Sequence, residues 1–462
     1  MDEVNAFLGK EKIGKLLLKF SLPCILSMVI GALYNIVDQL FIGNSELGYF
    51  GNAATSIVYP ITIIVLAFAL MWGDGCAAYM SIAQGKKDTS KVNNAIGTCL
   101  IASLLMGLII VIICGFLAEP ILTAFGASGQ TLTYAKTYLY TLLPGIPFYL
   151  IATMLVSVVR ADGSPKYSMI ATLTGCFVNI ALDPLFIFAF KMGMVGAALA
   201  TVIGQLSCFV FMLVYFIKGY KTFKLKLYSF KPNFSLLGKA SQMGLSSFLT
   251  NISTVVLSIV TNILLSKYGS TSIYGADIPV AVIGIVFKVF GIIISIAVGV
   301  AIGGQPILGY NYGAKNYHRV KETFKLIMIV DVIIGIVATV LVEAIPQYII
   351  QLFGSDGGDL YIEYACYAFR IYLMLILFTC LTKAMAIFFQ SIERPFTAII
   401  IALGRDIVLL IPSLIIGSAI GGESDGVVSM LWAAPISDVL SLIIGIILVI
   451  CFFRKISSKQ SA

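Results

Sequence analysis

The sequence predicts an all-α integral membrane protein of twelve transmembrane helices, arranged as two parallel six-helix lobes related by a pseudo-two-fold axis along the membrane normal. Its composition, its distribution of basic residues and an internal repeat support this prediction. Of the 462 residues, 59% are hydrophobic and 11% are charged, whereas soluble domains carry about 25% charged residues. Apolar stretches of about 20 residues, the length that crosses a bilayer, recur along the whole chain.

Twelve stretches are long and apolar enough to be membrane spans. The first, residues 16–42, is too long for the hydrophobic region of a cleavable signal peptide, so it is predicted to be a span. The other predicted spans cover residues 54–80, 93–118, 134–159, 167–190, 194–217, 241–266, 279–309, 321–345, 360–388, 396–418 and 427–453. No large soluble domain is left between them.

Basic residues gather in alternate connecting segments. The segments on the side of the N-terminus hold most of the 30 Lys and Arg residues, whereas the opposite loops hold only Lys191 and Lys267. By the positive-inside rule, both termini are predicted to be cytoplasmic, in a multi-pass protein of the cell membrane. This distribution indicates membrane orientation, and not nucleic-acid binding, as the reason for the net charge of +8.

The two halves of the chain resemble each other. The stretch AQGKKDTSKV near residue 85 resembles NYGAKNYHRV near residue 313, and a shift of 228 residues pairs Gly75 with Gly303 and Gly85 with Gly313. Each half contains an even number of spans, so both copies have the same orientation, as in transporters built from parallel repeats. The predicted units are an N-terminal lobe (1–217), a basic cytoplasmic connector (218–239) and a C-terminal lobe (240–462).

Two acidic residues of the first half are predicted to lie in the outer part of the membrane. Asp183 lies about 10 Å from the outer end of the fifth span at 1.5 Å per residue, and Asp38 lies nearer the outer end of the first. Asn179 shares a helix face with Asp183, and Thr201 reaches a similar depth in the sixth span. Because charges in hydrocarbon are costly and mark ion pathways, these residues are predicted to form an oxygen-rich pocket for a cation or a proton.

Three neighbours are predicted to support this site. Tyr34 and Asn35 share a face of the first span with Asp38, and Pro184 follows Asp183 directly. Proline leaves the carbonyl group of Ile180 without its helical donor, which adds an oxygen to the pocket. Such oxygen ligands suit a small hard cation such as Na⁺, or a shared proton. In the alternative interpretation, Pro184 only kinks the helix. The Asn and Thr side chains then form the hydrogen bonds that the Asp183 carboxylate needs, and no ion is bound.

The second half carries a different set of charges within its spans. The positive residues are Lys288, Arg370 and Arg405, and the negative residues are Asp331, Asp406 and Asp438. Three charges of each sign at similar depth predict an internally paired network that stabilises the lobe, and a role in proton or substrate handling is the alternative. Asp74 and Lys383, near the inner ends of the second and tenth spans, are predicted to lie at the membrane interface.

The sequence lacks the motifs of other functional classes. None of its nine cysteines forms a CxxC pair, and His318 lies in a basic loop without a partner ligand nearby. The chain contains no GxxxxGK[ST] nucleotide loop and no HExxH or Ser–His catalytic set. An enzyme, an ATP-driven pump and a bound cofactor are therefore not expected.

Several motifs resemble those of the multidrug and toxic compound extrusion (MATE) family. They are GGQPILGYNYGAK (303–315), RADGSPKYS, QSIERPFTA and GMVGAALAT, and the resemblance covers essentially the whole chain. The loop between spans two and three, QGKKDTSK, does not fit the major facilitator type. The resemblance implies two lobes around a central cavity and a secondary antiporter, which exports amphipathic, cationic organic compounds in exchange for H⁺ or Na⁺.

The resemblance also implies which residues bind the coupling ion. Asp38, Asn179, Asp183 and Thr201 match the family's cation site in the first lobe. Another branch of the family places acids in spans seven and ten, whereas span seven here has none and Glu363 lies at the rim of span ten. This departure favours the DinF-like and MepA-like branch.

The alternative function is a lipid-linked saccharide flippase of the same superfamily, which usually has fourteen spans and a strongly basic cavity. The expected partners are small organic substrates, H⁺ or Na⁺ and membrane lipid, and the protein is expected to be a monomer without a cofactor. The sequence names neither the substrate nor the coupling ion.

Overall fold

The structure is a computed structural model that describes residues 7–88, 90–218, 227–275, 277–351 and 358–460. Nearly all of these residues are helical, and no β-strand occurs among them. Eleven helices are long and apolar enough to cross a membrane, and the pair Asp359–Leu373 and Ile376–Ser391, bent by 43°, brings the number to twelve when counted as one span. The predicted all-α membrane fold is confirmed.

The first half of the chain provides spans one to six. Its helices are α1 (Phe7–Lys10), α2 (Ile13–Gly43), α3 (Gly48–Gly85), α4 (Val92–Ala124), α5 (Gly129–Leu142), α6 (Ile146–Ala161), α7 (Pro165–Pro184) and α8 (Gly193–Lys218). A 3₁₀ turn, η1 (Leu143–Gly145), joins α5 to α6 within the fourth span, and a π turn, η2 (Leu185–Ala189), completes the fifth. Pro144 and Pro184 lie at these breaks, because proline cannot donate the backbone hydrogen bond that continues a helix.

The second half provides spans seven to twelve. Its elements are η3 (Leu227–Phe230), α9 (Phe234–Gly269), α10 (Asp277–Gly313), α11 (Tyr317–Ala344), α12 (Pro346–Gln351), α13 (Gly358–Leu373), α14 (Ile376–Ser391), α15 (Pro395–Leu403), η4 (Gly404–Leu410), α16 (Ile411–Ser429), η5 (Met430–Trp432) and α17 (Ala433–Gln460). The π turn η4 interrupts the eleventh span, the repeat counterpart of the fifth. π turns are rare and often lie at functional sites, and here one occurs in each half, in spans five and eleven.

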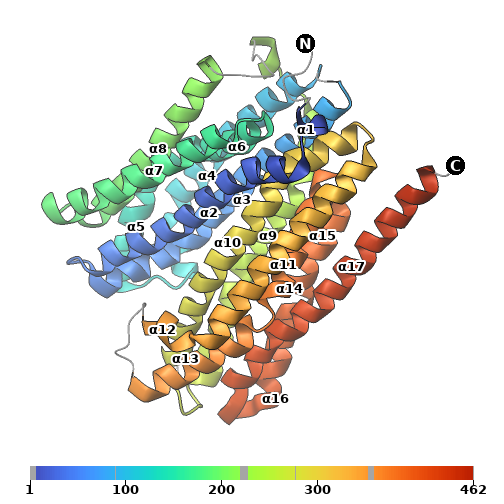
Figure 1. Ribbon diagram of the computed structural model, residues 1–462. Coiled ribbons are helices and arrows are strands. Elements are labelled where there is room, and N and C mark those ends of the chain that lie inside the picture. The colour runs from blue at the N-terminus through green and yellow to red at the C-terminus, as the bar shows by residue number, and fades with distance from the viewer. Residues whose placement is uncertain (1–6, 89, 219–226, 276, 352–357, 461–462) are drawn as a thin grey trace.

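The two halves lie side by side, with both ends of the chain at the same end of the molecule (Figure 1). Helix α2 packs against α10 and α3 against α9, so spans one and two contact spans eight and seven of the other half. A Cβ atom on Gly85 would overlap the carbonyl oxygen of Tyr310, and one on Gly313 would overlap that of Ile82. Because a shift of 228 residues exchanges these two contacts, a pseudo-two-fold axis passes between them.

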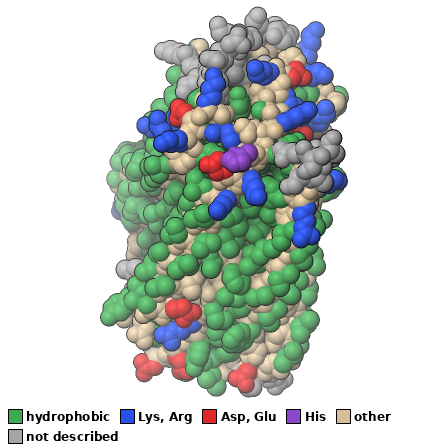
Figure 2. Space-filling model, turned by 45° about the vertical axis from the view of Figure 1, so that its right-hand side comes forward, with side chains coloured by type: hydrophobic (Ala, Val, Ile, Leu, Met, Phe, Trp, Pro, Cys, Tyr) green, Lys and Arg blue, Asp and Glu red, His purple; other side chains and the backbone are tan. Residues whose placement is uncertain are grey.

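The surface shows how this fold sits in a bilayer. Figure 2 shows a broad hydrophobic belt around the middle of the molecule, with Lys and Arg gathered at the end that carries the termini and acidic residues at the opposite end. Large apolar side chains in the belt are exposed, among them Phe116 (85%) and Val408 (64%). Exposed apolar area on this scale is stable only against lipid, which agrees with the predicted membrane location.

The predicted connector, residues 218–239, is described only in part, because residues 219–226 lie outside the described ranges. Its second part lies against the start of α4, where the Asn94 side-chain amide donates to the carbonyl group of Lys231 at 2.7 Å. Helix α9 begins at Phe234, inside the predicted connector. The lobe boundaries at residues 217 and 240 stay a prediction.

Candidate cation and substrate site

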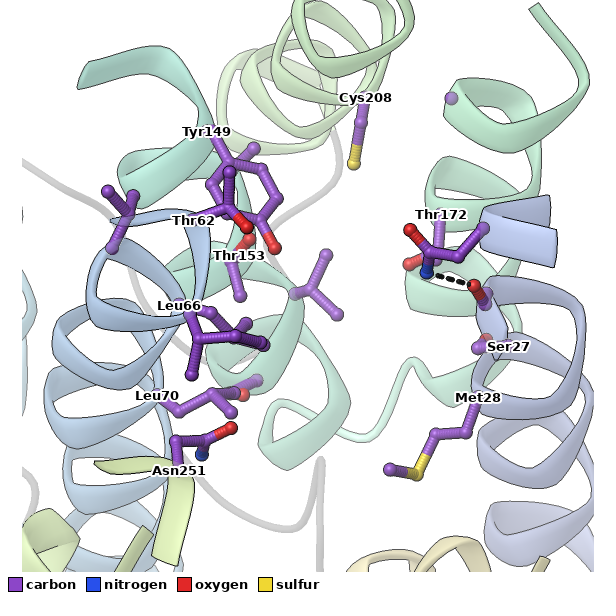
Figure 3. A pocket seen from close by; sticks show the side chains of 18 of the residues that line it. Ser27, Met28, Thr62, Leu66, Leu70, Tyr149, Thr153, Thr172, Cys208 and Asn251 are labelled. Carbon is purple, nitrogen blue, oxygen red and sulfur yellow. Dashed lines mark hydrogen bonds between the residues drawn. The ribbon is translucent and has the colours of Figure 1, made fainter. Parts of the chain in front are cut away.

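A central cavity of about 700 Å³ lies between the two halves. Helices α2, α3 and α5 to α8 of the first half form most of its wall, and α9, α10, α14 and α15 contribute from the second. In Figure 3, Thr62, Leu66 and Tyr149 lie on one wall, and Ser27 and Met28 face them from the other. Most of the wall area is apolar, but hydroxyl and amide side chains occur throughout it, and four charged residues line it as well: Asp38, Asp74, Arg160 and Lys383.

Asn179 joins the fifth and sixth spans beside this cavity. Its side-chain nitrogen lies 3.5 Å from an oxygen of Asp183 and 3.4 Å from the hydroxyl oxygen of Thr201. Exchanging the amide oxygen and nitrogen gives better contacts: the nitrogen then donates to Asp183 at 3.3 Å, and the oxygen accepts from the Thr201 backbone N–H at 3.2 Å. We favour this second orientation, and in both orientations Asn179 donates to Asp183.

The two predicted acids meet at this site. The carboxyl groups of Asp38 on α2 and Asp183 on α7 lie within hydrogen-bonding distance of each other. Asp183 is fully buried, Asp38 is half-buried, and one Asp38 oxygen has no hydrogen-bond partner among the described residues. Two carboxylates this close cannot both be ionised without cost, so the chemistry of the pair suits a shared proton or a bound cation. The structure thus brings Asp38, Asn179, Asp183 and Thr201 together around one point.

The neighbouring residues differ in how they contribute. Tyr34 lies near Asp38 in the cavity wall, whereas the Asn35 side chain donates to the Gly31 carbonyl of its own helix at 2.7 Å. Pro184 is the last residue of α7, directly before the π turn. Sequence reasoning missed Tyr138, a buried residue of α5 whose hydroxyl group hydrogen-bonds Thr201. A tyrosine in an apolar helix carries no spacing signal that would reveal such a contact.

Asp74, predicted to lie at the membrane interface, is enclosed by protein side chains. Asp74 is buried (5% exposed), and one of its oxygens accepts hydrogen bonds from Ser157 at 2.9 Å and from Arg160 at 3.1 Å. The other oxygen accepts from Ser247 of the second half at 3.0 Å. Helix α3 continues to Gly85, so Asp74 lies about 16 Å from its end at 1.5 Å per residue. These groups form the inner end of the cavity.

The second half contains the predicted network of paired charges, with changed membership. Arg405 contacts Asp438 at 2.7 Å and Asp406 at 2.8 Å, which confirms pairing for these three residues. Lys383, which was not predicted to be a member, joins them through Asp406 at 2.8 Å.

The remaining three predicted members stand apart from this network. Asp331 is fully buried, and neither of its carboxyl oxygens has a hydrogen-bond partner among the described residues. Arg370 is exposed and Lys288 is half-buried, and neither forms an ion pair with a described residue. Similar depth in the membrane therefore did not suffice to predict which charges meet.

A comparison with known protein families identifies the family of this chain. The MatE family model matches residues 23–185 and 246–416, one segment in each half of the chain. This chain belongs to the MATE family. The resemblance seen in the sequence motifs is thereby confirmed.

Relatives and solved structures agree with this assignment. The multidrug export protein MepA of Staphylococcus aureus (strain MRSA252) is 27% identical over 443 residues, which cover 96% of each chain. MepA of Staphylococcus haemolyticus (strain JCSC1435) is 30% identical over 355 residues, 77% of this MATE chain and 76% of that protein.

Two solved structures share the whole fold. A MOP superfamily transporter from Pyrococcus furiosus superposes with a TM-score of 0.91 over 99% of each chain, at 21% identity. An outward-facing multidrug resistance MATE transporter superposes with a TM-score of 0.90 over 100% of each chain, also at 21% identity. At this identity the likeness shows that the MATE fold is shared.

Proposed function

We propose that this MATE protein is a secondary antiporter of the cell membrane, which exports amphipathic, cationic organic compounds in exchange for H⁺ or Na⁺. The observation that carries the proposal is the Asp38–Asp183 carboxyl pair beside a large, mostly apolar cavity. The relatives named as multidrug export proteins support the same class of activity.

The cavity suits this class of substrate. Its volume of about 700 Å³ is that of a pocket for a drug-sized molecule. Leu66, Leu70 and Met28 offer apolar contacts, and Tyr149 offers a ring face to a cationic group. Methionine and leucine side chains adapt to ligands of different shape, which favours a broad range of substrates over one specific compound.

Coupling follows from competition at the carboxyl pair. When the pair is ionised, its negative charge attracts a cationic substrate in the adjoining cavity. A proton or Na⁺ bound at Asp38 and Asp183 removes that charge and weakens the attraction, so cation entry drives release of the substrate. The effect is reciprocal, because bound substrate must lower the affinity of the pair for the ion by the same factor.

The orientation forms part of the proposal. Lys and Arg gather at the end of the molecule that carries both termini, which the positive-inside rule assigns to the cytoplasm (Figure 2). The carboxyl pair then lies in the outer part of the membrane, where it meets ions that enter from outside. Single-cysteine labelling in a cysteine-free background tests this topology, since an impermeant reagent should not label residue 231 or 455 in intact cells.

The cavity favours drug export over the alternative of a lipid-linked saccharide flippase. A flippase of the superfamily usually has a strongly basic cavity, which suits a pyrophosphate-linked substrate. Here the charged groups in the wall are Asp38 and Asp74 against Arg160 and Lys383, and each of these two bases is already paired with an acid. A cavity of this polarity does not favour an anionic substrate.

Transport by purified protein in proteoliposomes tests the proposal. Ethidium, a fluorescent organic cation, serves as the probe, and a pH gradient and a Na⁺ gradient are imposed separately. We expect at least one gradient to drive ethidium against its concentration gradient, and collapse of that gradient with an ionophore to stop it. Accumulation under neither gradient would contradict antiport.

A further inference from the structure

A second pocket, of about 650 Å³, opens at the end of the molecule that carries the termini. It lies where the last turn of α3, the start of α4, the start of α9 and the corner between α14 and α15 meet. Four basic side chains line it, Lys86, Lys91, Lys239 and Arg394, against the two acids Asp88 and Glu393. The pocket therefore carries an excess of positive charge.

The two acids compensate only half of this positive charge. Glu393 contacts Lys86 at 3.1 Å, and Asp88 accepts a hydrogen bond from Ser90 at 2.7 Å. Lys91, Lys239 and Arg394 form no ion pair with a described residue, although all three are exposed at the pocket. Three cations directed to one hollow favour a ligand with a phosphate group, which accepts hydrogen bonds from several of them at once.

The surroundings indicate a lipid as the source of that phosphate. Phe396 lines the pocket and is 65% exposed, and Ile400, one turn further along α15, is 54% exposed. The pocket thus continues into an apolar stripe of α15 that runs toward the hydrophobic belt of the molecule. Basic pockets between transmembrane helices at the cytoplasmic side bind the head groups of anionic lipids.

We propose that this pocket binds the head group of an anionic phospholipid of the inner leaflet, with an acyl chain lying along Phe396 and Ile400. Lys91 belongs to the first half of the chain, whereas Lys239 and Arg394 belong to the second. One bound phosphate therefore links both halves of the chain. The two halves must separate at this place if the cavity is to open toward this end of the molecule. Bound lipid stabilises the state in which this end is closed. The location in the inner leaflet rests on the proposed orientation, but the binding itself does not.

Lipid retention by the purified full-length protein tests the proposal. Delipidated protein is titrated with phosphatidylglycerol or phosphatidylcholine, and the bound lipid is counted by native mass spectrometry. We expect selective retention of phosphatidylglycerol, and the triple variant Lys91→Gln, Lys239→Gln, Arg394→Gln should weaken it on the order of 100-fold.

A matched control separates a pocket from diffuse surface charge. The triple variant Lys321→Gln, Lys325→Gln, Arg454→Gln removes the same charge from exposed side chains at the same end of the molecule, outside the pocket. If this control retains as much phosphatidylglycerol as the unmodified protein, the result supports the pocket. Equal loss of phosphatidylglycerol in both triple variants overturns it. Displacement of the lipid by inorganic phosphate at a similar concentration would overturn the lipid assignment. Because binding is measured without a gradient, failure here is distinct from failure of the antiport proposal.

Discussion

The carboxyl pair of the first half and the charge network of the second half hold their buried acids in opposite ways. In the first half, Asp38 and Asp183 contact each other and neutral groups, and no described Lys or Arg forms an ion pair with either. In the second half, Arg405 lies between Asp406 and Asp438 and Lys383 pairs with Asp406, so two bases balance two acids within this network. Asp331, which has no hydrogen-bond partner among the described residues, lies outside the network. An acid that lacks a built-in cation must take one from solution. We therefore expect coupling to depend on the carboxyl pair of the first half and stability to depend on the charge network of the second.

The largest effect is expected from Asp183→Asn. The amide keeps the size of the side chain and its contact with Asn179 but cannot take up a proton, so the protein should fold while gradient-driven export falls to the level of empty vesicles. Ethidium transport in proteoliposomes measures this. Glu46→Gln, which removes an exposed acid from the loop after α2, is the matched control and should transport normally. Full activity of Asp183→Asn at normal protein levels would remove Asp183 from the coupling site.

The equivalent change in the second half should affect folding instead. Arg405→Met removes the only charge partner that the described residues give Asp438, and breaking a buried pair in this way costs about 3–5 kcal/mol. Thermal unfolding in detergent should show a large loss of stability, most of which returns in the double variant Arg405→Met, Asp438→Asn. If Arg405→Met were as stable as the unmodified protein but inactive, the second half would share in coupling.

The pH dependence of substrate affinity sharpens the comparison. Protons compete with the cationic substrate at Asp38 and Asp183, so affinity for ethidium should fall as pH is lowered, by up to about tenfold per pH unit for one proton. Equilibrium binding in detergent measures this slope with and without Na⁺, and Asp38→Asn should flatten it. An affinity that stays constant between about pH 5 and about pH 9 and also ignores Na⁺ would contradict the competition.

The sequence predicted the fold far better than the contacts between spans. Hydropathy, basic loops and the repeat defined twelve spans, because a bilayer requires long apolar helices and basic residues concentrate in the loops on one side of it. The first-half acids were found because residues at equal depth in neighbouring spans of one lobe could be compared. The contacts of Asp74 were missed because its partners, Arg160 and Ser247, come from distant spans whose packing no spacing rule reveals. The broken fourth span and the 43° bend of the tenth were missed for a similar reason, since hydropathy does not register helix breaks.

The smallest effect is expected from Pro184→Ala, which tests why the π turn adjoins the carboxyl pair. Alanine supplies the missing backbone N–H to the Ile180 carbonyl, a hydrogen bond of about 1 kcal/mol, which corresponds to a change of about fivefold in an equilibrium. If that carbonyl contributes to ion binding, the ion should compete about fivefold less well with ethidium, while ethidium affinity at high pH without Na⁺ stays the same. Pro412→Ala, next to the π turn of the second half, is the matched control and should leave competition unchanged. The same binding titration compares all three proteins. Lost transport with competition intact in Pro184→Ala would show that the proline serves the movement of span five, because the ion would still bind and displace substrate without being carried across.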